Sequence, residues 1–391
     1  MNTTTPAQNS LLIDYLKKHE GMEGAHLTCT LACEGGGKNY STHRKRFLNL
    51  LKDLEKDKAV LEAYPESLQT VVELCRSLAT DGERWSGDYE GVCIHVSEQG
   101  ENLINLRRPP IEFTRVEDRF YYRPAAGALA ARREMLALSL SFKQPELYIF
   151  DGESAEVFGE IDLPESVYAF SEEGALDASQ HAHIRRSRDT GTPQTVNQGF
   201  SPTQSPRELN EPIFLRELSH ALRDLKESQE LPLLVVGDEN IVGEFVKVYD
   251  HPFGEIDTEM GMQSHPKASD IARICSDLCA EKQRQEMLEI KKELKQAEAG
   301  RMESFSDNVK EIYEAAEQGR VASCAVASDE NAWCRFDEKK GFQSADPEKD
   351  SDAVEALDWI FVKTWLNGGK AIAIPSKDIP GVKKVAALYR W

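Results

Sequence analysis

Three short β-type segments separated by tight breaks place the strongest constraint on the fold of this chain. The segments are Met135–Phe142, Glu146–Phe150 and Ala155–Ile161. The first break ends in Pro145 and the second is the pair Asp151-Gly152, and both are turn sequences. Strands joined by such short connections pair side by side in opposite directions, so the pattern predicts a three-stranded antiparallel meander.

A long polar stretch follows this meander. Residues 171–212 are rich in Ser, Thr, Gln, Asn and Gly and show little apolar periodicity. Connections of this length without regular structure are uncommon, and are usually functional or disordered. Within the stretch, Ala178–Arg207 holds four Arg and one Asp, a net charge of +3, whereas residues 131–258 together carry −13.

A basic loop on an acidic body is a suitable probe for RNA, because Arg binds phosphates bidentately and stacks on bases. A solvated loop without a role is the equally weighted alternative. The loop residues that we expect to contact RNA are His181, His183, Arg185, Arg186, Arg188, Asn197, Gln198, Gly199 and Arg207.

A second basic cluster opens the helix predicted over residues 41–61. It follows the tripeptide Gly35–Gly37, but Ala32 and Asn39 stand where a phosphate-binding P-loop needs Gly and Ser or Thr, so we exclude a nucleotidase site. Contact with RNA phosphates is one interpretation of the cluster, and an ordinary solvated helix face is the more frequent one. Its members are Gly36, Gly37, Lys38, Asn39, His43, Arg44, Lys45 and Arg46.

Apolar periodicity predicts the remaining elements and an α/β class. Helices are expected at 41–61, 68–78, 213–225, 268–299, 309–318 and 353–366, and further strands at 91–96, 111–122, 231–236, 321–326 and 371–374. Length predicts two to four domains.

Composition excludes several functional classes. Lys and Arg number 47 against 67 Asp and Glu, so the net charge of −20 argues against a non-specific polyanion binder. No apolar run approaches the roughly 20 residues of a membrane span, and the first ten residues lack a signal-peptide pattern. We therefore expect a cytoplasmic protein with no membrane partner and with its eight cysteines reduced.

Motifs for catalysis or metal binding are missing. The sequence has no Gly-x-Ser-x-Gly, His-Glu-x-x-His or dinucleotide-binding glycine pattern. The pairs Cys29/Cys33 and Cys275/Cys279 have a spacing that zinc accepts, but buried free thiols are the default interpretation. We expect no catalytic residue, no metal and no cofactor.

The middle and last thirds resemble domains 2 and 3 of the archaeo-eukaryotic class 1 release factors and Pelota. The resemblance rests on MLALSLSFKQPELYIFDGESAEVFGEIDLP, LPLLVVGDENI, DNVKEIYEAAEQGRVASCAVAS and LNGGKAIAIPSKDIPGVKKVAALYRW. Together with VEDRFYYRPAAG upstream, it is similar to the bacterial branch, the baeRF proteins, to which hibernation factors of the Balon type belong. It covers about residues 111–391 and implies three domains, at residues 1–130, 131–258 and 259–391. The middle one would be ribonuclease-H-like and the C-terminal one L7Ae-like.

The departures from this family bear most on function. Its Gly-Gly-Gln tripeptide, which places a water at the peptidyl-tRNA ester, is absent, and Asn197-Gln198-Gly199 is a superficial echo. Its Asn-Ile-Lys-Ser codon-reading motif is absent too. The resemblance therefore implies a ribosome-binding factor, not an enzyme, that occupies the A site in hibernation or stress-induced arrest.

The resemblance also implies partners and leaves rivals. The 70S ribosome is the implied partner, with the loop on the peptidyl-transferase side and the N-terminal cluster on the decoding side. Elongation factor Tu or another translational GTPase would contact the C-terminal domain, and the protein would be monomeric off the ribosome. The alternatives are a Pelota-like rescue factor, an RNA-cleaving or peptidyl-tRNA-hydrolysing enzyme using His181 or His183, and a cytosolic scaffold.

Overall fold

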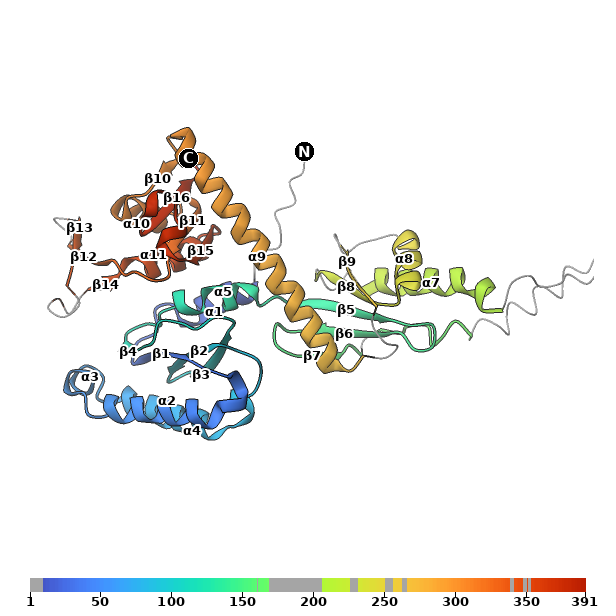
Figure 1. Cartoon of the computed structure of the whole chain (residues 1–391), viewed down its shortest axis with the longest axis horizontal. Coiled ribbons are helices and arrows are strands. Elements are labelled where there is room, and N and C mark those ends of the chain that lie inside the picture. The colour runs from blue at the N-terminus through green and yellow to red at the C-terminus, as the bar shows by residue number, and fades with distance from the viewer. Residues whose placement is uncertain are drawn as a thin grey trace, which may run out of the picture. The chain divides into compact units, whose positions relative to one another are not determined.

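The computed structural model describes residues 10–159, 161–168, 206–225, 231–249, 256–261, 266–337, 341–346, 350 and 353–391. Helices and strands are mixed throughout these residues, which confirms the α/β class (Figure 1). The chain forms two compact units, one of residues 1–132 with 279–391 and the other of residues 133–278. The expected boundary at 130/131 lies two residues from one of these junctions, while the first and last predicted domains share a unit.

A five-stranded sheet forms the base of the unit at residues 133–278. Its strands, in the order β7-β6-β5-β8-β9, are β7 (Ala155–Val157), β6 (Glu146–Phe150), β5 (Met135–Leu140), β8 (Leu233–Gly237) and β9 (Ile256–Met260). Met135 pairs with Phe150 and Phe150 with Ala155 in antiparallel ladders, so the predicted meander is confirmed. β8 runs parallel to β5, and β9 runs parallel to β8.

Two helices cover one face of this sheet. They are α7 (Pro206–Leu225) and α8 (Glu239–Val248). Leu138 of β5 belongs to one apolar cluster with Phe214 and Phe245 of these helices. α7 begins seven residues before the predicted helix, and α8 was not predicted. The ribonuclease-H-like class of this unit stays a prediction.

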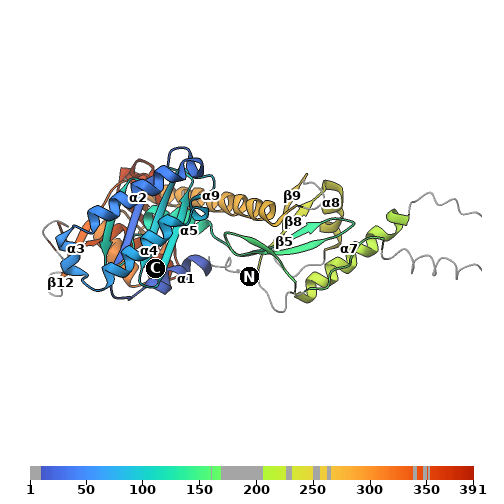
Figure 2. The ribbon, with the colours of Figure 1, turned by 90° about the horizontal axis from the view of Figure 1, so that it is seen from below.

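A four-stranded antiparallel sheet forms the first part of the other unit. Its strands, in the order β3-β2-β1-β4, are β3 (Gly100–Leu106), β2 (Gly91–Ser97), β1 (His26–Ala32) and β4 (Phe113–Glu117). Helices α2 (Tyr40–Leu54) and α4 (Ser67–Thr80) run side by side across one face, as Figure 2 shows. Phe47, Val71 and Trp85 fill the core beneath them.

The helix predicted over residues 41–61 is two helices. α2 ends at Leu54, and α3 (Lys58–Ala63) begins after Asp57. The Asp57 carboxylate accepts hydrogen bonds from the amides of Ala59 at 3.0 Å and Val60 at 3.4 Å, so it caps a new helix start. Apolar residues keep their helical spacing across this break, so the sequence pattern did not predict it.

A second sheet carries the last part of the chain. Its strands, in the order β10-β16-β11-β15, are β10 (Phe305–Ser306), β16 (Val385–Tyr389), β11 (Val321–Ala327) and β15 (Lys370–Ile374). Helices α10 (Val309–Glu317) and α11 (Ala356–Leu366) pack on it, close to the predicted ranges. A small sheet of β13 (Gly341–Ser344), β12 (Trp333–Asp337) and β14 (Val354–Glu355) adjoins α11. The L7Ae-like class stays a prediction.

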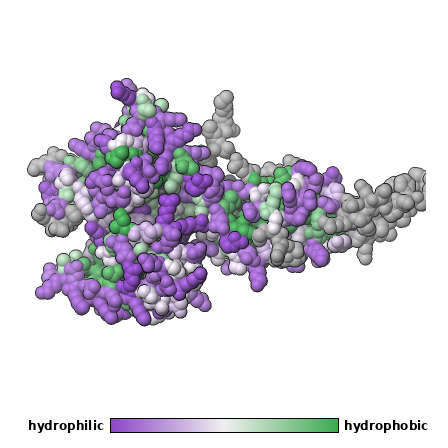
Figure 3. Space-filling view, viewed as in Figure 1, coloured by the Kyte–Doolittle hydropathy of each residue, from purple (hydrophilic) through white to green (hydrophobic). Residues whose placement is uncertain are grey.

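The two ends of the chain share a hydrophobic core. Helices α1 (Ser10–His19) and α5 (Ala126–Ala131) bring Leu12, Leu16 and Leu129 into one buried cluster with Leu357 and Phe361 of α11. The long helix α9 (Ala268–Gly300) contributes residues to both units, divided between 278 and 279. The face seen in Figure 3 is mostly hydrophilic, with small separate hydrophobic patches.

Candidate functional site

The glycine tripeptide before α2 serves packing instead of anion binding. The Gly36 amide donates to the Cys33 carbonyl at 3.1 Å, and the Gly37 amide donates to the Gly87 carbonyl at 3.0 Å. A Cβ on Gly36 would lie 2.8 Å from the Tyr89 carbonyl oxygen, and one on Gly37 would lie 2.6 Å from Gly87 backbone atoms. Both amides are therefore used inside the fold, and the glycines are needed for close approach to residues 87–89.

Three polar residues of the N-terminal cluster are anchored to backbone carbonyls. The Asn39 amide nitrogen donates to the Glu34 carbonyl at 2.9 Å, and Arg44 Nε donates to the Ala79 carbonyl. Arg46 donates to the Ala32 carbonyl at 2.8 Å and pairs with Glu112 at 2.5 Å. Arg46 thus ties α2 to β1 and Arg44 ties it to α4, so only part of each guanidinium is left for a ligand.

The other three members of the cluster divide into one buried ring and two free ammonium groups. His43 is 3 % exposed, and neither of its ring nitrogens has a hydrogen-bond partner among the described residues. It was predicted to contact rRNA, but its ring lies inside the fold beside Tyr89. Lys38 and Lys45 are exposed, and their side chains form no ion pair with any described residue. They are the members best placed to meet a phosphate.

The predicted peptidyl-transferase-side loop lies almost wholly outside the described residues. His181, His183, Arg185, Arg186, Arg188, Asn197, Gln198 and Gly199 belong to that part of the chain. Arg207 lies in the first turn of α7, and its side chain is not described. These assignments stay predictions.

A buried histidine cluster escaped the sequence analysis. The Phe120 ring lies 4.9 Å from His19, 4.8 Å from His26 and 4.6 Å from His95, measured between ring centroids. His95 Nε2 faces the Tyr121 carbonyl at 2.9 Å and therefore carries the proton, so Nδ1 accepts from the Tyr15 hydroxyl at 2.8 Å. The three histidines come from α1, β1 and β2, so no local spacing could have indicated the cluster.

Burial keeps these histidines neutral. Desolvation lowers the pKa of His95 to about 3 and that of His19 to about 4, and it also lowers the pKa of His26. Their rings are nine-tenths or more buried, which makes them part of the packing between α1 and the sheet. None is placed to act as an acid or base toward a substrate.

A buried ion pair joins the two ends of the chain. Arg123 Nη2 lies 3.1 Å from Glu355 Oε2, and these residues are 7 % and 0 % exposed. The Asp358 carboxylate accepts from the amides of Tyr122 and Arg123, each at 2.8 Å. Desolvation raises the pKa of Asp358 to about 6 despite the Arg123 charge. This cluster is structural, because its charged groups pair with one another or with backbone groups of the protein.

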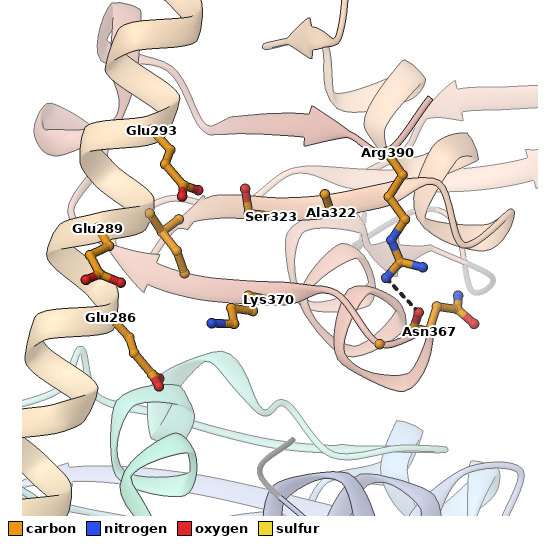
Figure 4. Close-up of a pocket in the computed structure, with 10 residues that line it drawn as sticks. Glu286, Glu289, Glu293, Ala322, Ser323, Asn367, Lys370 and Arg390 are labelled. Atoms are coloured by element: carbon orange, nitrogen blue, oxygen red, sulfur yellow. Dashed lines mark hydrogen bonds between the residues drawn. The ribbon is translucent and has the colours of Figure 1, made fainter. Parts of the chain in front are cut away.

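An open pocket of about 560 Å³ lies between α9 and the second sheet (Figure 4). Three glutamates of α9 line one side, and Lys370 and Arg390 lie on the strand side. The remaining lining residues are Ile290, Ala322, Ser323, Asn367 and Gly368. The sequence analysis missed this pocket, since it joins segments up to 104 residues apart, from Glu286 to Arg390.

The described residues offer no group of three His, Cys, Asp or Glu side chains that could hold a metal ion. All eight cysteines are buried, and none of them forms a disulfide bond. Burial raises the pKa of Cys29 to about 12 and that of Cys33 to about 11, so these thiols are protonated at neutral pH. No helix in the described ranges is long and apolar enough to cross a membrane.

Comparison with known proteins identifies the middle of the chain. Residues 136–320 match the family described as bacterial archaeo-eukaryotic release factor family 3, which confirms the predicted resemblance. No curated protein matches the sequence.

Solved structures show only distant likeness. An archaeal translation termination factor, aRF1, is 14% identical over 98% of each chain, with a TM-score of 0.21. A model of ribosome-bound archaeal Pelota and ABCE1 is 12% identical over 75% of this chain and 72% of that one, with a TM-score of 0.38. Dom34 from S. cerevisiae is 9% identical over 75% of this chain and 73% of that one, with a TM-score of 0.33.

Proposed function

Residues 136–320 match the bacterial archaeo-eukaryotic release factor family 3, and from this match we propose that the protein is a ribosome-binding factor. It occupies the A site without hydrolysing peptidyl-tRNA and holds the ribosome in hibernation or stress-induced arrest. It is not an enzyme, and it acts in the cytoplasm.

One observation carries this proposal. The family match spans the polar stretch in which a release factor of this kind holds Gly-Gly-Gln, yet that tripeptide occurs nowhere in the sequence. The resemblance implies that the Gln-bearing loop positions the hydrolytic water. A body of this family without that loop chemistry is suited to occupancy of the site.

Charge supports the same function. The stretch 178–207 has a net charge of +3 on a chain of net charge −20, so contact with rRNA phosphates is confined to it and a few other positions. In the N-terminal part, Lys38 and Lys45 are exposed and form no ion pair with any residue that the structure describes. Few phosphate contacts give a shallow dependence of affinity on salt, because the slope scales with the number of contacts.

The partners follow from this function. The protein binds the 70S ribosome as a monomer, with the stretch 178–207 toward the peptidyl-transferase centre and the N-terminal cluster toward the decoding centre. Elongation factor Tu or another translational GTPase contacts the C-terminal part.

Co-sedimentation with vacant 70S ribosomes tests this proposal. The intact protein should pellet with ribosomes, and a variant with residues 178–207 replaced by a Gly-Ser linker should pellet weakly. The double variant Glu62→Gln/Glu66→Gln, which changes two exposed carboxylates elsewhere, is the control and should pellet as the intact protein does. If the intact protein stays in the supernatant even with elongation factor Tu and GDP present, ribosome binding is refuted.

A second measurement separates arrest from rescue. Ribosomes stalled on a truncated message are incubated with the protein, and the fraction of split subunits is followed on sucrose gradients. Arrest predicts that 70S particles persist. Stimulated splitting would instead support the Pelota-like rescue function.

A further inference from the structure

The pocket beside α9 has an acidic wall built by helical spacing. Glu286, Glu289 and Glu293 stand at positions i, i+3 and i+7 of one helix, so they lie along one face (Figure 4). The sheet side supplies Ala322 and Ser323, whose small side chains leave the hollow open. Three carboxylates in a row repel the phosphates of RNA, so this wall is suited to a cationic partner.

Part of the wall is unused by the protein itself. The carboxylates of Glu289 and Glu293 form no ion pair or hydrogen bond with any described residue, and both residues are exposed. Two nearby pairs on α9 are formed: Glu281 pairs with Arg284 at 2.7 Å, and Lys291 pairs with Asp378 at 3.3 Å. The pocket therefore holds two acceptors that the fold does not satisfy.

A serine that is mostly buried presents its hydroxyl to the same pocket. Ser323 is 6 % exposed, lines the pocket, and its side chain has no hydrogen-bond partner among the described residues. In Figure 4 its hydroxyl points from the strand toward the side of Glu293. The hydroxyl is reached from the pocket and can exchange a hydrogen bond with a group bound there.

The opposite side of the pocket is cationic. Arg390 donates to the Asn367 carbonyl at 2.9 Å and is held in place, while the exposed Lys370 side chain has no ion-pair partner among the described residues. Groups of both signs facing one hollow fit a peptide segment, which brings a basic side chain together with carbonyl oxygens. A simple cation would leave the Lys370 side unused.

We propose that this pocket receives an arginine or lysine side chain of a ribosomal protein. The guanidinium or ammonium pairs with Glu289 and Glu293 and donates to the Ser323 hydroxyl, and Lys370 donates to a backbone carbonyl beside it. This inference rests on the proposed function, which brings the chain to the ribosome, a particle of RNA and basic proteins. Charge complementarity selects the basic protein surface and excludes the RNA.

Zero-length cross-linking tests the pocket directly. A carbodiimide couples a carboxylate to a lysine amine in contact with it, and the products in the ribosome pellet are mapped by mass spectrometry. The expected cross-link joins a peptide containing Glu289 or Glu293 to a ribosomal protein. A cross-link from these residues to elongation factor Tu overturns the proposal. The proposal is also overturned if no cross-link forms and the variant Glu289→Gln/Glu293→Gln binds ribosomes as tightly as wild type.

The affinity of the protein for 70S ribosomes gives a second measurement. It also detects an arginine partner, which has no amine for the carbodiimide to couple. Glu289→Gln/Glu293→Gln should weaken binding to 70S ribosomes roughly fivefold at low salt, and less at high salt, because each partly exposed ion pair contributes modestly. The control Glu62→Gln/Glu66→Gln should bind as wild type. Unchanged affinity of the pocket variant refutes the pocket while leaving ribosome binding intact, whereas failure of the wild type to bind refutes both.

Discussion

Arg123 and Glu355 form an ion pair at 3.1 Å that is almost completely buried, although 232 residues separate them in the chain. Arg123 also donates to Asn331 at 2.7 Å and to the Glu330 carbonyl at 2.7 Å. Glu355 accepts from the Ala332 amide at 2.7 Å. The pair therefore makes the two ends of the chain one unit.

Removal of one partner of this pair should destabilise the protein strongly. Glu355→Gln removes the charge paired with the buried Arg123 and leaves it only the nearby Asp358 carboxylate, and breaking a buried pair costs about 3–5 kcal/mol of unfolding free energy. Urea unfolding followed by circular dichroism measures the change. Glu244→Gln breaks the exposed pair with Lys247 and should cost less than about 1 kcal/mol. Equal effects of the two substitutions would contradict the structural role of the buried pair.

Acid should weaken the fold through the buried histidines. The folded pKa values of His95, about 3, and His19, about 4, lie below the ordinary 6.5, so the unfolded chain binds these protons first. Their stabilising contribution is complete above pH 6.5 and is lost as the pH falls toward 4. Asp358 opposes this partly, since its raised pKa of about 6 lets the folded state take up a proton between pH 6 and 4.

Urea midpoints of wild type and His19→Gln/His95→Gln at pH 7.5, 5.5 and 4.5 measure this effect. The variant should be less stable at pH 7.5, because it loses ring packing and the hydrogen bond from Tyr15. Its stability should fall less steeply below pH 6.5. Parallel curves for the two proteins would show that these histidines do not titrate with folding.

Gly37 should tolerate no side chain. A Cβ at this position would lie 2.6 Å from the Gly87 backbone, and overpacking of this kind costs about 1–3 kcal/mol. Gly243→Ala is the matched control, because a Cβ in the middle of α8 has no neighbour within 4 Å and the change favours helix. Thermal unfolding should show a lower midpoint for Gly37→Ala and an equal or higher one for Gly243→Ala.

Lys38 and Lys45 should act on ribosome affinity without acting on stability. Each substitution to Ala removes one exposed ammonium, so the slope of log affinity against log salt should decrease by about one for each phosphate that is no longer neutralised. The unfolding midpoint should stay that of wild type. Sedimentation from 50 to 300 mM salt gives the slope, and a slope unchanged by both substitutions would remove this cluster from the rRNA interface.

The sequence predicted local elements well where turn residues and periodicity agree. Pro145 and Asp151-Gly152 located the meander, and 268–299 matched α9 almost to its ends. α8 was not predicted although Asp238 caps it by accepting from the Asn240 amide, because Gly237 and Asp238 are also typical turn residues. The sequence thus contains the capping residue Asp238, but the preceding Gly237 favours a turn equally well.

The candidate site was less predictable. His43 lies four residues before Phe47 and eight before Leu51, so helical geometry already placed it on the buried face of α2. As a member of a basic cluster His43 was predicted to contact RNA, but its position in the helix places its side chain in the core. The Arg123–Glu355 pair, the histidine cluster and the acidic pocket each join segments far apart in the chain, and local patterns carry no information about such long-range packing.

A single assay on programmed ribosomes tests the central claim most directly. Ribosomes with labelled peptidyl-tRNA in the P site are incubated with the protein, and then aminoacyl-tRNA is delivered by elongation factor Tu. The account predicts that aminoacyl-tRNA fails to enter the A site while the peptidyl-tRNA ester stays intact. Release of the labelled peptide, or normal entry of aminoacyl-tRNA into ribosomes that hold the protein, would contradict it.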